Sequence, residues 1–396
     1  MSHVFSRRHF IQSAAAGAGL LNLAAADNET IQGFDDTASN TVKNKEWAPV
    51  SDRKIRMGIV GYGVCKFGAA FGFQDHPNVE VAAVSDLFPD RCAELARVCR
   101  CDKTYPSLEE LVKDPNIEAV FVATDAPSHC RHCIDVLAHG KHVATAVPAV
   151  WGSVEDAGKL LDAVKASGLN YMMFETSAYH DDCYAMREIY NAGGFGTIVY
   201  SEGEYYHYLA TPIDSYKGWR IGCPPLWYPT HSTAYHTCVS GGGFTEVSCL
   251  GMPSELEWLQ SGGNAYGNVF GTEIALLRTT EGGMSRMLMS KDTAGHGGET
   301  GRVRGQKGSM IGMNYDGLAD ISNLQLAKPP LPPGVDPGGH GGSHGYLGNE
   351  FIHSIIEERK PLVDIVAALK LTVCGIVAHE SAQKDGELLK IPQFTL

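Results

Sequence analysis

Three residues near the beginning of the chain have the types and spacing that bind a dinucleotide. Gly61 and Gly63 follow a short apolar run, and Asp86 ends a second apolar run about twenty residues later. Glycines at these positions allow a tight turn and a close approach to a pyrophosphate at a helix N-terminus. A carboxylate at position 86 would bind ribose hydroxyls and repel the extra phosphate of NADP. The pattern therefore predicts an NAD site and hydride-transfer chemistry.

This glycine pattern is incomplete, because Lys66 occupies the third glycine position and Gly68 follows two residues later. An ordinary glycine turn in an α/β protein is the alternative. The small residues Ala69 and Ala70 and the apolar run that ends at Asp86 favour the cofactor site. Lys66 could contact phosphate or lie solvated at the rim of the loop.

Tyr228 and His231 could transfer protons, since their ordinary pKa values are about 10 and about 6.5 and their surroundings could bring both toward neutrality. Pro229 keeps Tyr228 extended and favours a helix that begins directly afterwards, which places His231 in the first helical turn. On these residues alone, a buried histidine and a tyrosine bonded to a backbone carbonyl are the favoured explanation of the pattern.

His340 and His344 stand four residues apart in a glycine-rich run. Such a pair could bind a metal ion together with His207 or His231. A helix that would place both rings on one face is improbable among so many glycines, so no metal site is predicted. Glycines also suit a loop that lies close against a ligand.

The surrounding elements should position these groups at the edge of a sheet. Strands and helices alternate from residue 55 to residue 177, which predicts a doubly wound parallel sheet of the Rossmann type. Thr124, Pro127 and His129 follow the carboxyl end of the strand at 119–123, where such sheets bind ligands. We expect these three residues, with Pro148 after the next strand, to border the cofactor.

The second half of the chain has a different character. Aromatic strands punctuated by glycine begin near residue 198 and predict a C-terminal α+β domain with a mostly antiparallel open sheet. We place this domain at 178–345 and assign 346–396 to closing helices and a tail. Tyr179, just past the last Rossmann strand, could line the nicotinamide end of the cleft.

Composition excludes several classes of partner. The 396 residues carry a formal net charge of −13, so nucleic acid and anionic membranes are disfavoured. The eleven cysteines are an odd number and cannot all pair. We expect mostly free thiols, because the N-terminal signal described next implies folding in a reducing compartment before export. The net charge favours a small polar molecule as the ligand.

The N-terminus has the features of an export signal. Arg7 and Arg8 precede a mildly apolar stretch and small residues, which resembles a twin-arginine signal over 1–26, followed by a polar linker over 27–54. That route exports proteins that are already folded, so the cofactor would be exported bound to the protein. The mature protein would be periplasmic or secreted. Outside the signal, the sequence has no run of eighteen consecutive apolar residues, so no membrane span is predicted for the mature protein.

Several motifs together resemble the Gfo/Idh/MocA oxidoreductase superfamily over residues 55 to 394. They are the glycine turn, Val84-Ser85-Asp86, the segment 124–129 and Gly140-Lys141-His142-Val143. The resemblance implies a Rossmann domain joined to a sheet domain that holds a carbohydrate substrate. It also implies a homo-oligomer that assembles through the C-terminal sheet.

Ala146-Val147-Pro148 stands where ordinary family dehydrogenases have Glu-Lys-Pro, whose lysine assists proton transfer. This departure resembles the NAD-dependent glycosidase branch of α-N-acetylgalactosaminidase type. So do Tyr205-Tyr206-His207, Trp219-Arg220, Tyr228-Pro229-Thr230-His231 and His340-Gly341-Gly342. The resemblance implies that Tyr228 and His231 are catalytic and that His207, Arg220 and His340 contact substrate. His344 would also lie there, in place of the acid that the branch leads us to expect.

Three functions remain open from the sequence. The first is glycoside cleavage, in which hydride removal from a ring carbon by bound NAD permits elimination and the hydride is later returned. The second is a sugar or polyol dehydrogenase or a sugar–sugar oxidoreductase. The third is an exported, non-catalytic sugar-binding protein. Val147 favours the first, because a plain dehydrogenase would need another proton acceptor.

Overall fold

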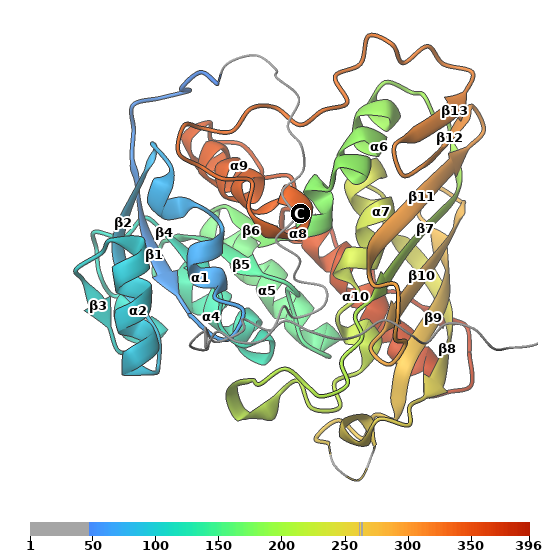
Figure 1. Ribbon diagram of the computed structural model, residues 1–396, viewed down its shortest axis with the longest axis horizontal. Helices are drawn as coiled ribbons and strands as arrows, with labels where there is room; N and C mark the ends of the chain where they lie inside the picture. Colours follow the sequence, from blue (N-terminus) through green and yellow to red (C-terminus); the bar gives the residue numbers. More distant parts are fainter. Residues whose placement is uncertain (1–46, 261, 263) are drawn as a thin grey trace, which may run out of the picture. The chain divides into compact units, whose positions relative to one another are not determined.

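The computed structural model describes residues 47–396 except 261 and 263, and these residues build two sheets (Figure 1). The expected signal sequence at 1–26 and most of the linker at 27–54 lie outside the described residues. Both sheets have the predicted types, one parallel and one mostly antiparallel.

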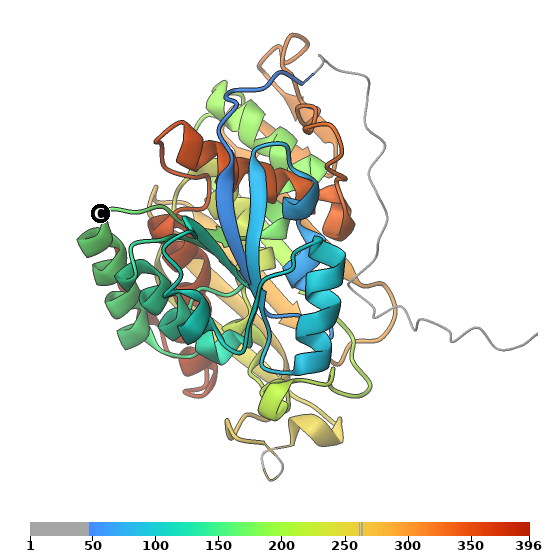
Figure 2. The same cartoon turned by 90° about the vertical axis from the view of Figure 1, so that its left-hand side faces the viewer.

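The parallel sheet has six strands in the order β3-β2-β1-β4-β5-β6. The strands are β1 (Ile55–Val60), β2 (Val79–Ser85), β3 (Thr104–Tyr105), β4 (Ala119–Val122), β5 (His142–Ala146) and β6 (Tyr171–Phe174). The order reverses between β1 and β4, and ligands bind at such a switch point. The helices between them are α1 (Phe67–Ala70), α2 (Pro89–Cys99), α3 (Leu108–Leu111), α4 (His129–Ala138) and α5 (Val154–Ser167). Figure 2 shows α2 on one side of the central strands and α5 on the other.

Local signals explain where these helices begin and end. The Ser153 hydroxyl accepts a hydrogen bond from the Asp156 amide at the start of α5, and Gly168 ends that helix with φ 65°. The strands between the helices are apolar on both faces, and β1, β4 and β6 contain fully buried side chains such as Met57, Phe121 and Phe174. This double burial makes the sheet a rigid platform for the loops at its carboxyl edge.

The second sheet has eight strands in the order β13-β12-β11-β7-β10-β9-β8-β14, and the pair β7 and β10 is parallel. Its strands are β7 (Ile198–Tyr206), β8 (Phe244–Pro253), β9 (Phe270–Thr279), β10 (Met284–Ser290), β11 (Gly298–Gly305), β12 (Gly308–Ile311), β13 (Asn314–Gly317) and β14 (Leu389–Lys390). The helix α7 (Thr230–Ser240) packs against α6 (Asp181–Asn191) and α10 (Ile365–Ala382), and α7 and α10 also contact the strands. Short α8 (Gly339–Gly342) and α9 (His344–Ile356) precede α10.

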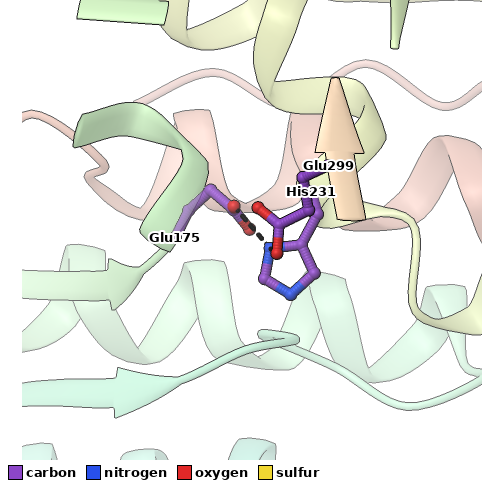
Figure 3. A group of neighbouring side chains, drawn as sticks. All are labelled: Glu175, His231 and Glu299. Carbon is purple, nitrogen blue, oxygen red and sulfur yellow. Dashed lines mark hydrogen bonds and ion pairs between the residues drawn. The ribbon is translucent and has the colours of Figure 1, made fainter. Parts of the chain in front are cut away.

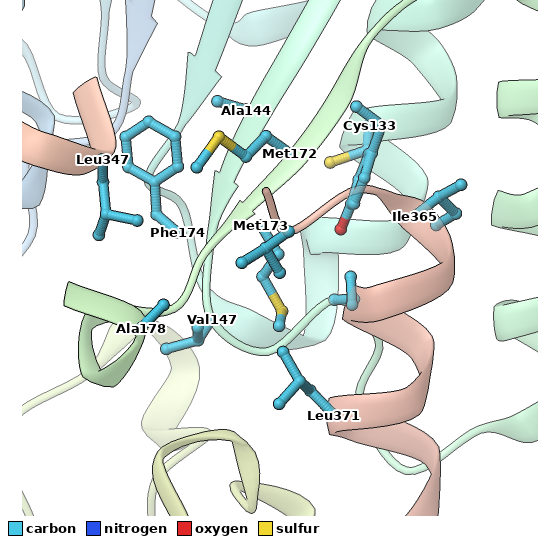
Figure 4. Packing of buried hydrophobic residues seen from close by; sticks show 14 of the residues in the cluster. Cys133, Ala144, Val147, Met172, Met173, Phe174, Ala178, Leu347, Ile365 and Leu371 are labelled. Atoms are coloured by element: carbon cyan, nitrogen blue, oxygen red, sulfur yellow. The ribbon is translucent and has the colours of Figure 1, made fainter. Parts of the chain in front are cut away.

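The C-terminal helices also complete the core of the parallel sheet. Figure 4 shows Met173 and Phe174 of β6 packed between Leu347 of α9 and Leu371 of α10. Among the described helices, α10 alone is long and apolar enough to cross a bilayer, with a mean hydropathy of 1.5. Because 78% of that segment is buried, we assign it to the core of the fold.

A pair of glycines lets α7 sink into the large sheet. Gly203 of β7 and Gly301 of β11 are register partners. A methyl group at Gly203 would overlap the carbonyl oxygen of Ser232, and one at Gly301 would overlap the ring of Tyr235. The two bare backbones therefore form a notch for the helix, and its first turn reaches the ends of β7 and β11.

All eleven cysteines lie within the described residues and are free thiols, whereas the sequence predicted that most would be. Cys130 and Cys133 are buried on α4. Burial raises the pKa of the Cys130 thiol to about 12, so this pair packs as small apolar side chains.

Candidate active site

A cavity of about 510 Å³ opens at the carboxyl edge of the parallel sheet, between the loops that follow β1, β2 and β4. We call it the outer cavity. Gly61, Gly63, Asp86 and Thr124 of the predicted cofactor set line it. It lies at the switch point of the strand order, where a dinucleotide is expected.

Two glycines of the loop after β1 and one glycine of α1 have separate roles. Gly61 has φ 101°, and a methyl group there would overlap the carbonyl oxygen of Ala123. A methyl group at Gly63 would meet no atom within 4 Å, so its backbone faces open space in the cavity. A methyl group at Gly68 would overlap the carbonyl oxygen of Gly61. Gly68 thus permits the close packing that the third glycine of the motif normally permits, and Lys66 lines the cavity with φ 50°.

The carboxylate of Asp86 is fixed at the wall of this cavity. One oxygen accepts a hydrogen bond from the Tyr62 amide at 2.6 Å, and the other accepts from the Phe88 amide at 2.8 Å. Each carboxylate oxygen has a second lone pair for a ribose hydroxyl. The open backbone of Gly63 and this anchored acid fit a dinucleotide without a 2′-phosphate.

Pro127, His129 and Pro148 do not line the outer cavity but support it. The buried ring of His129 lies between two carbonyl oxygens, that of Pro148 at 2.9 Å from Nδ1 and that of Thr124 at 3.2 Å from Nε2. Burial lowers the pKa of His129, and a neutral imidazole has one N–H to donate. His129 therefore donates to one of the two carbonyls and packs between the Thr124 loop and the segment after β5, while Pro127 lies in the short helical turn Ala126–Ser128.

A second cavity of about 30 Å³, the inner cavity, adjoins the outer one. Trp219 and Arg220 line both. The inner cavity is also lined by Tyr205, His207, Leu209, Pro212, Cys223, Tyr228, Trp258, Met289 and Lys291. The structure thus brings together three of the predicted residues, His207, Arg220 and Tyr228, at one small site.

His231 lies directly behind Tyr228 and is held by two glutamates (Figure 3). The ring centroids of Tyr228 and His231 are 5.4 Å apart. Nδ1 of His231 is 2.8 Å from Oε1 of Glu175 and 3.7 Å from Oε1 of Glu299. Nε2 points away from both carboxylates (Figure 3).

The cluster is almost inaccessible to water, so its charges act strongly on one another. Burial lowers the pKa of His231, but the charges of Glu175 and Glu299 outweigh it and raise that pKa to about 9. Burial raises the pKa of Glu299, and His231 and neighbouring histidines outweigh this effect and bring it to about 2. His231 is therefore a cation at neutral pH.

Tyr228 differs from the expectation that its surroundings would bring its pKa toward neutrality. Burial raises the pKa of this hydroxyl above its ordinary value, and the nearby Arg220 offsets only part of that effect. Burial and the cations Arg220 and Lys291 lower the pKa of His207 to about 3. Both side chains are thus neutral hydrogen-bonding groups at pH 7.

Sequence reasoning missed both glutamates of the cluster. Glu175 directly follows β6, and a carboxylate at the carboxyl end of the last parallel strand was a usable signal. Glu299 lies in β11 opposite Tyr205, in a glycine-rich run that carries no such signal. Ligand atoms of Glu175, His231 and Glu299 lie within 4.8 Å of one another, so these residues could also hold a cation.

His340 and His344 meet each other instead of lining either cavity. His340 Nδ1 lies 3.0 Å from His344 Nε2, although His340 has a left-handed φ of 51° and α9 begins only at His344. Both rings contact Phe67, which lines the outer cavity. Tyr179 is also away from both cavities, because it stacks on Tyr346.

Comparisons with known proteins give a family match and similar folds. Residues 55–175 match the GFO_IDH_MocA family, described as an oxidoreductase family with an NAD-binding Rossmann fold. A glycosyl hydrolase family 109 protein of Porphyromonas gingivalis is 27% identical over 177 residues, which are 42% of this chain and 38% of that relative. A protein of the same description from Solibacter usitatus is 23% identical and covers 86% of this chain and 88% of its own.

A solved structure of levoglucosan dehydrogenase with NADH and levoglucosan has a TM-score of 0.71 and 18% identity. It covers 86% of this chain and 100% of its own. At this identity the likeness shows the shared fold. The matched stretch of the Porphyromonas relative is less than half of that protein's length.

Proposed function

Residues 55–175 make the chain a member of the Gfo/Idh/MocA oxidoreductase family, and from this we propose that it is an NAD-dependent enzyme that cleaves a glycoside by a redox-assisted route. The outer cavity, with Gly61, Gly63 and Asp86 in its wall, would hold NAD. The cofactor would supply reversible hydride exchange with a ring carbon, so that the neighbouring C–H becomes acidic enough for elimination of the aglycone, after which addition of water and return of the hydride would complete a net hydrolysis. The main support for the proposal is a cationic histidine that is held by two buried carboxylates and lies behind a tyrosine in the wall of the inner cavity.

In this proposal the chain supplies proton transfer and positioning. The Glu175 carboxylate accepts a hydrogen bond from Nδ1 of His231, which fixes the ring and leaves Nε2 to hold or release the mobile proton. The protonated Tyr228 hydroxyl meets the substrate, because Tyr228 lines the inner cavity and His231 does not. Val147, which replaces the lysine expected of dehydrogenases, is buried and has no proton to transfer.

The test uses protein purified without added nucleotide and a panel of aryl glycosides. We expect release of the aglycone without accumulation of NADH, and we expect Tyr228→Phe and His231→Ala to abolish it. Reduction of bound NAD by a free sugar without cleavage would instead identify the dehydrogenase or sugar–sugar oxidoreductase. Sugar binding without either reaction would identify a non-catalytic binding protein.

We also propose that copies of the chain associate through the eight-stranded sheet. Large apolar side chains are exposed on its strands, namely Val199, Leu250, Ile274, Leu276 and Ile311. Exposed apolar patches of this kind mark contact surfaces. Light scattering should show an oligomer that Leu276→Glu dissociates, and an unchanged mass would remove this proposal.

Export by the twin-arginine route is proposed from the N-terminal sequence. Replacement of Arg7 and Arg8 by lysines should retain the protein, with its bound nucleotide, in the cytoplasmic fraction. Unchanged fractionation would exclude this route.

A further inference from the structure

Lys291 is a buried cation in the wall of the inner cavity. It directly follows β10, and only 4% of its surface is exposed. Its ammonium group donates to the carbonyl oxygen of Cys223 at 2.6 Å and contacts the sulfur of the same residue. An ammonium group has three donors, so these contacts leave capacity for a further acceptor.

No carboxylate of the described residues lies within ion-pair distance of Lys291, nor of Arg220 at the mouth of the cavity. A buried charge without a counter-ion is costly, and proteins normally pair it. The ammonium group of buried Lys328 is paired in this way, since it lies 2.9 Å from the carboxylate of Asp181. The ammonium group of buried Lys141 is instead stabilised by two main-chain carbonyls, and it lines neither cavity.

The other residues that line the inner cavity also favour an anionic ligand. It contains two cations and the imidazole of His207, but no aspartate or glutamate. Sites for neutral sugars hold hydroxyl groups with acceptors as well as donors, whereas cationic donors select anions. Trp219 and Trp258 complete the aromatic wall of this cavity.

The size of the cavity restricts what can enter it. A water molecule needs roughly 10–15 Å³ measured in this way, so about 30 Å³ admits approximately two water-sized groups. This volume suits the two oxygens of a carboxylate, or part of a sulfate group, and is too small for a sugar ring.

We infer that the substrate of the proposed reaction is a carbohydrate bearing an acidic substituent, a carboxylate or a sulfate, which enters the inner cavity and pairs with Lys291. Arg220 lies at the entrance and would guide the acidic group. This inference rests on the proposed function only for the identity of the reaction, because binding of an acidic sugar can be measured without turnover.

The experiment compares three ligands of the same ring: a hexose, its uronate and its 6-sulfate. Thermal shift and calorimetry on the purified holoprotein should show the uronate or the sulfate bound roughly tenfold or more tightly than the hexose. The preferred acid identifies the substituent. Equal binding of all three ligands by the unmodified protein would overturn the inference without any variant.

Lys291→Met should remove the preference for the acid, and Lys291→Arg should keep it. Lys141→Met, which removes a buried lysine away from both cavities, should leave the preference intact. Tyr228→Phe should keep the preference and lose turnover, so failure of the proposed reaction is distinguishable from failure of this inference. An acid preference that survives in a folded Lys291→Met would overturn the role of Lys291.

Discussion

The variant Glu175→Gln tests whether the buried pair sets the protonation of His231. Gln has the same shape, and its carbonyl oxygen can still accept a hydrogen bond from Nδ1 of the ring. The change removes one negative charge 2.8 Å from that nitrogen and leaves Glu299 at 3.7 Å. The variant therefore separates charge from packing.

The structure gives the size of the effect. His231 has a pKa of about 9 against an ordinary value of 6.5, a difference that corresponds to about 3 kcal/mol in favour of the charged ring. Glu175 is the strongest cause of the increase and acts both through its charge and through a hydrogen bond. Without it, burial opposes Glu299 alone, so the pKa of His231 should return to about 6.5 or below.

The assay is the pH dependence of aglycone release. If His231 must be protonated, the rate falls as pH rises through about 9, and this alkaline limb should move to about 6.5 or below in Glu175→Gln. Glu281→Gln is the control, because it removes the carboxylate 3.3 Å from His236, a histidine on the same helix α7 as His231. The alkaline limb should stay in place in this variant. An alkaline limb that stays in place in Glu175→Gln would refute this account of His231.

The pKa of His231 is higher in the folded chain than its ordinary value, so its contribution to stability is complete below pH 6.5 and is lost as pH rises through about 9. Denaturant titrations across that range should show a fall in the free energy of unfolding, and this fall should be smaller in His231→Gln. Gly63→Ala should keep the melting temperature of the nucleotide-free protein but weaken NAD binding by at least roughly tenfold, whereas Gly61→Ala should lower the melting temperature itself; equal melting temperatures would contradict the assigned roles. Asp86→Ser should raise the affinity for NADP relative to NAD, and an unchanged ratio in direct titrations would remove Asp86 from cofactor selection.

The parallel sheet could be predicted because its signals are local. The turn at Gly61, the alternation of apolar strands with helices and the acid at the end of β2 each lie within one short stretch. The sequence also placed His231 correctly in the first turn of a helix after Pro229. It could not show that Gly68 replaces the missing third glycine, since that role depends on how α1 packs against the backbone of Gly61.

The centre of the site was less predictable because it depends on contacts between distant parts of the chain. Glu175 and His231 are 56 residues apart. Glu175 follows β6 of the parallel sheet, whereas His231 lies in α7, which packs on the other sheet. Glu299 reaches them only through the register that pairs it with Tyr205. The direction of the pKa change at Tyr228 was wrong for the same reason, because the extent of burial follows from the complete fold.

The glycine notch under α7 has a consequence for anyone who would engineer this protein. Replacing a strand glycine by valine or threonine is an ordinary way to strengthen a sheet. At Gly203 or Gly301 the same change would lift α7 from the strands and carry His231 away from Glu299. Neither glycine borders the cavities, yet substitutions that add a side chain at either position should disturb the site.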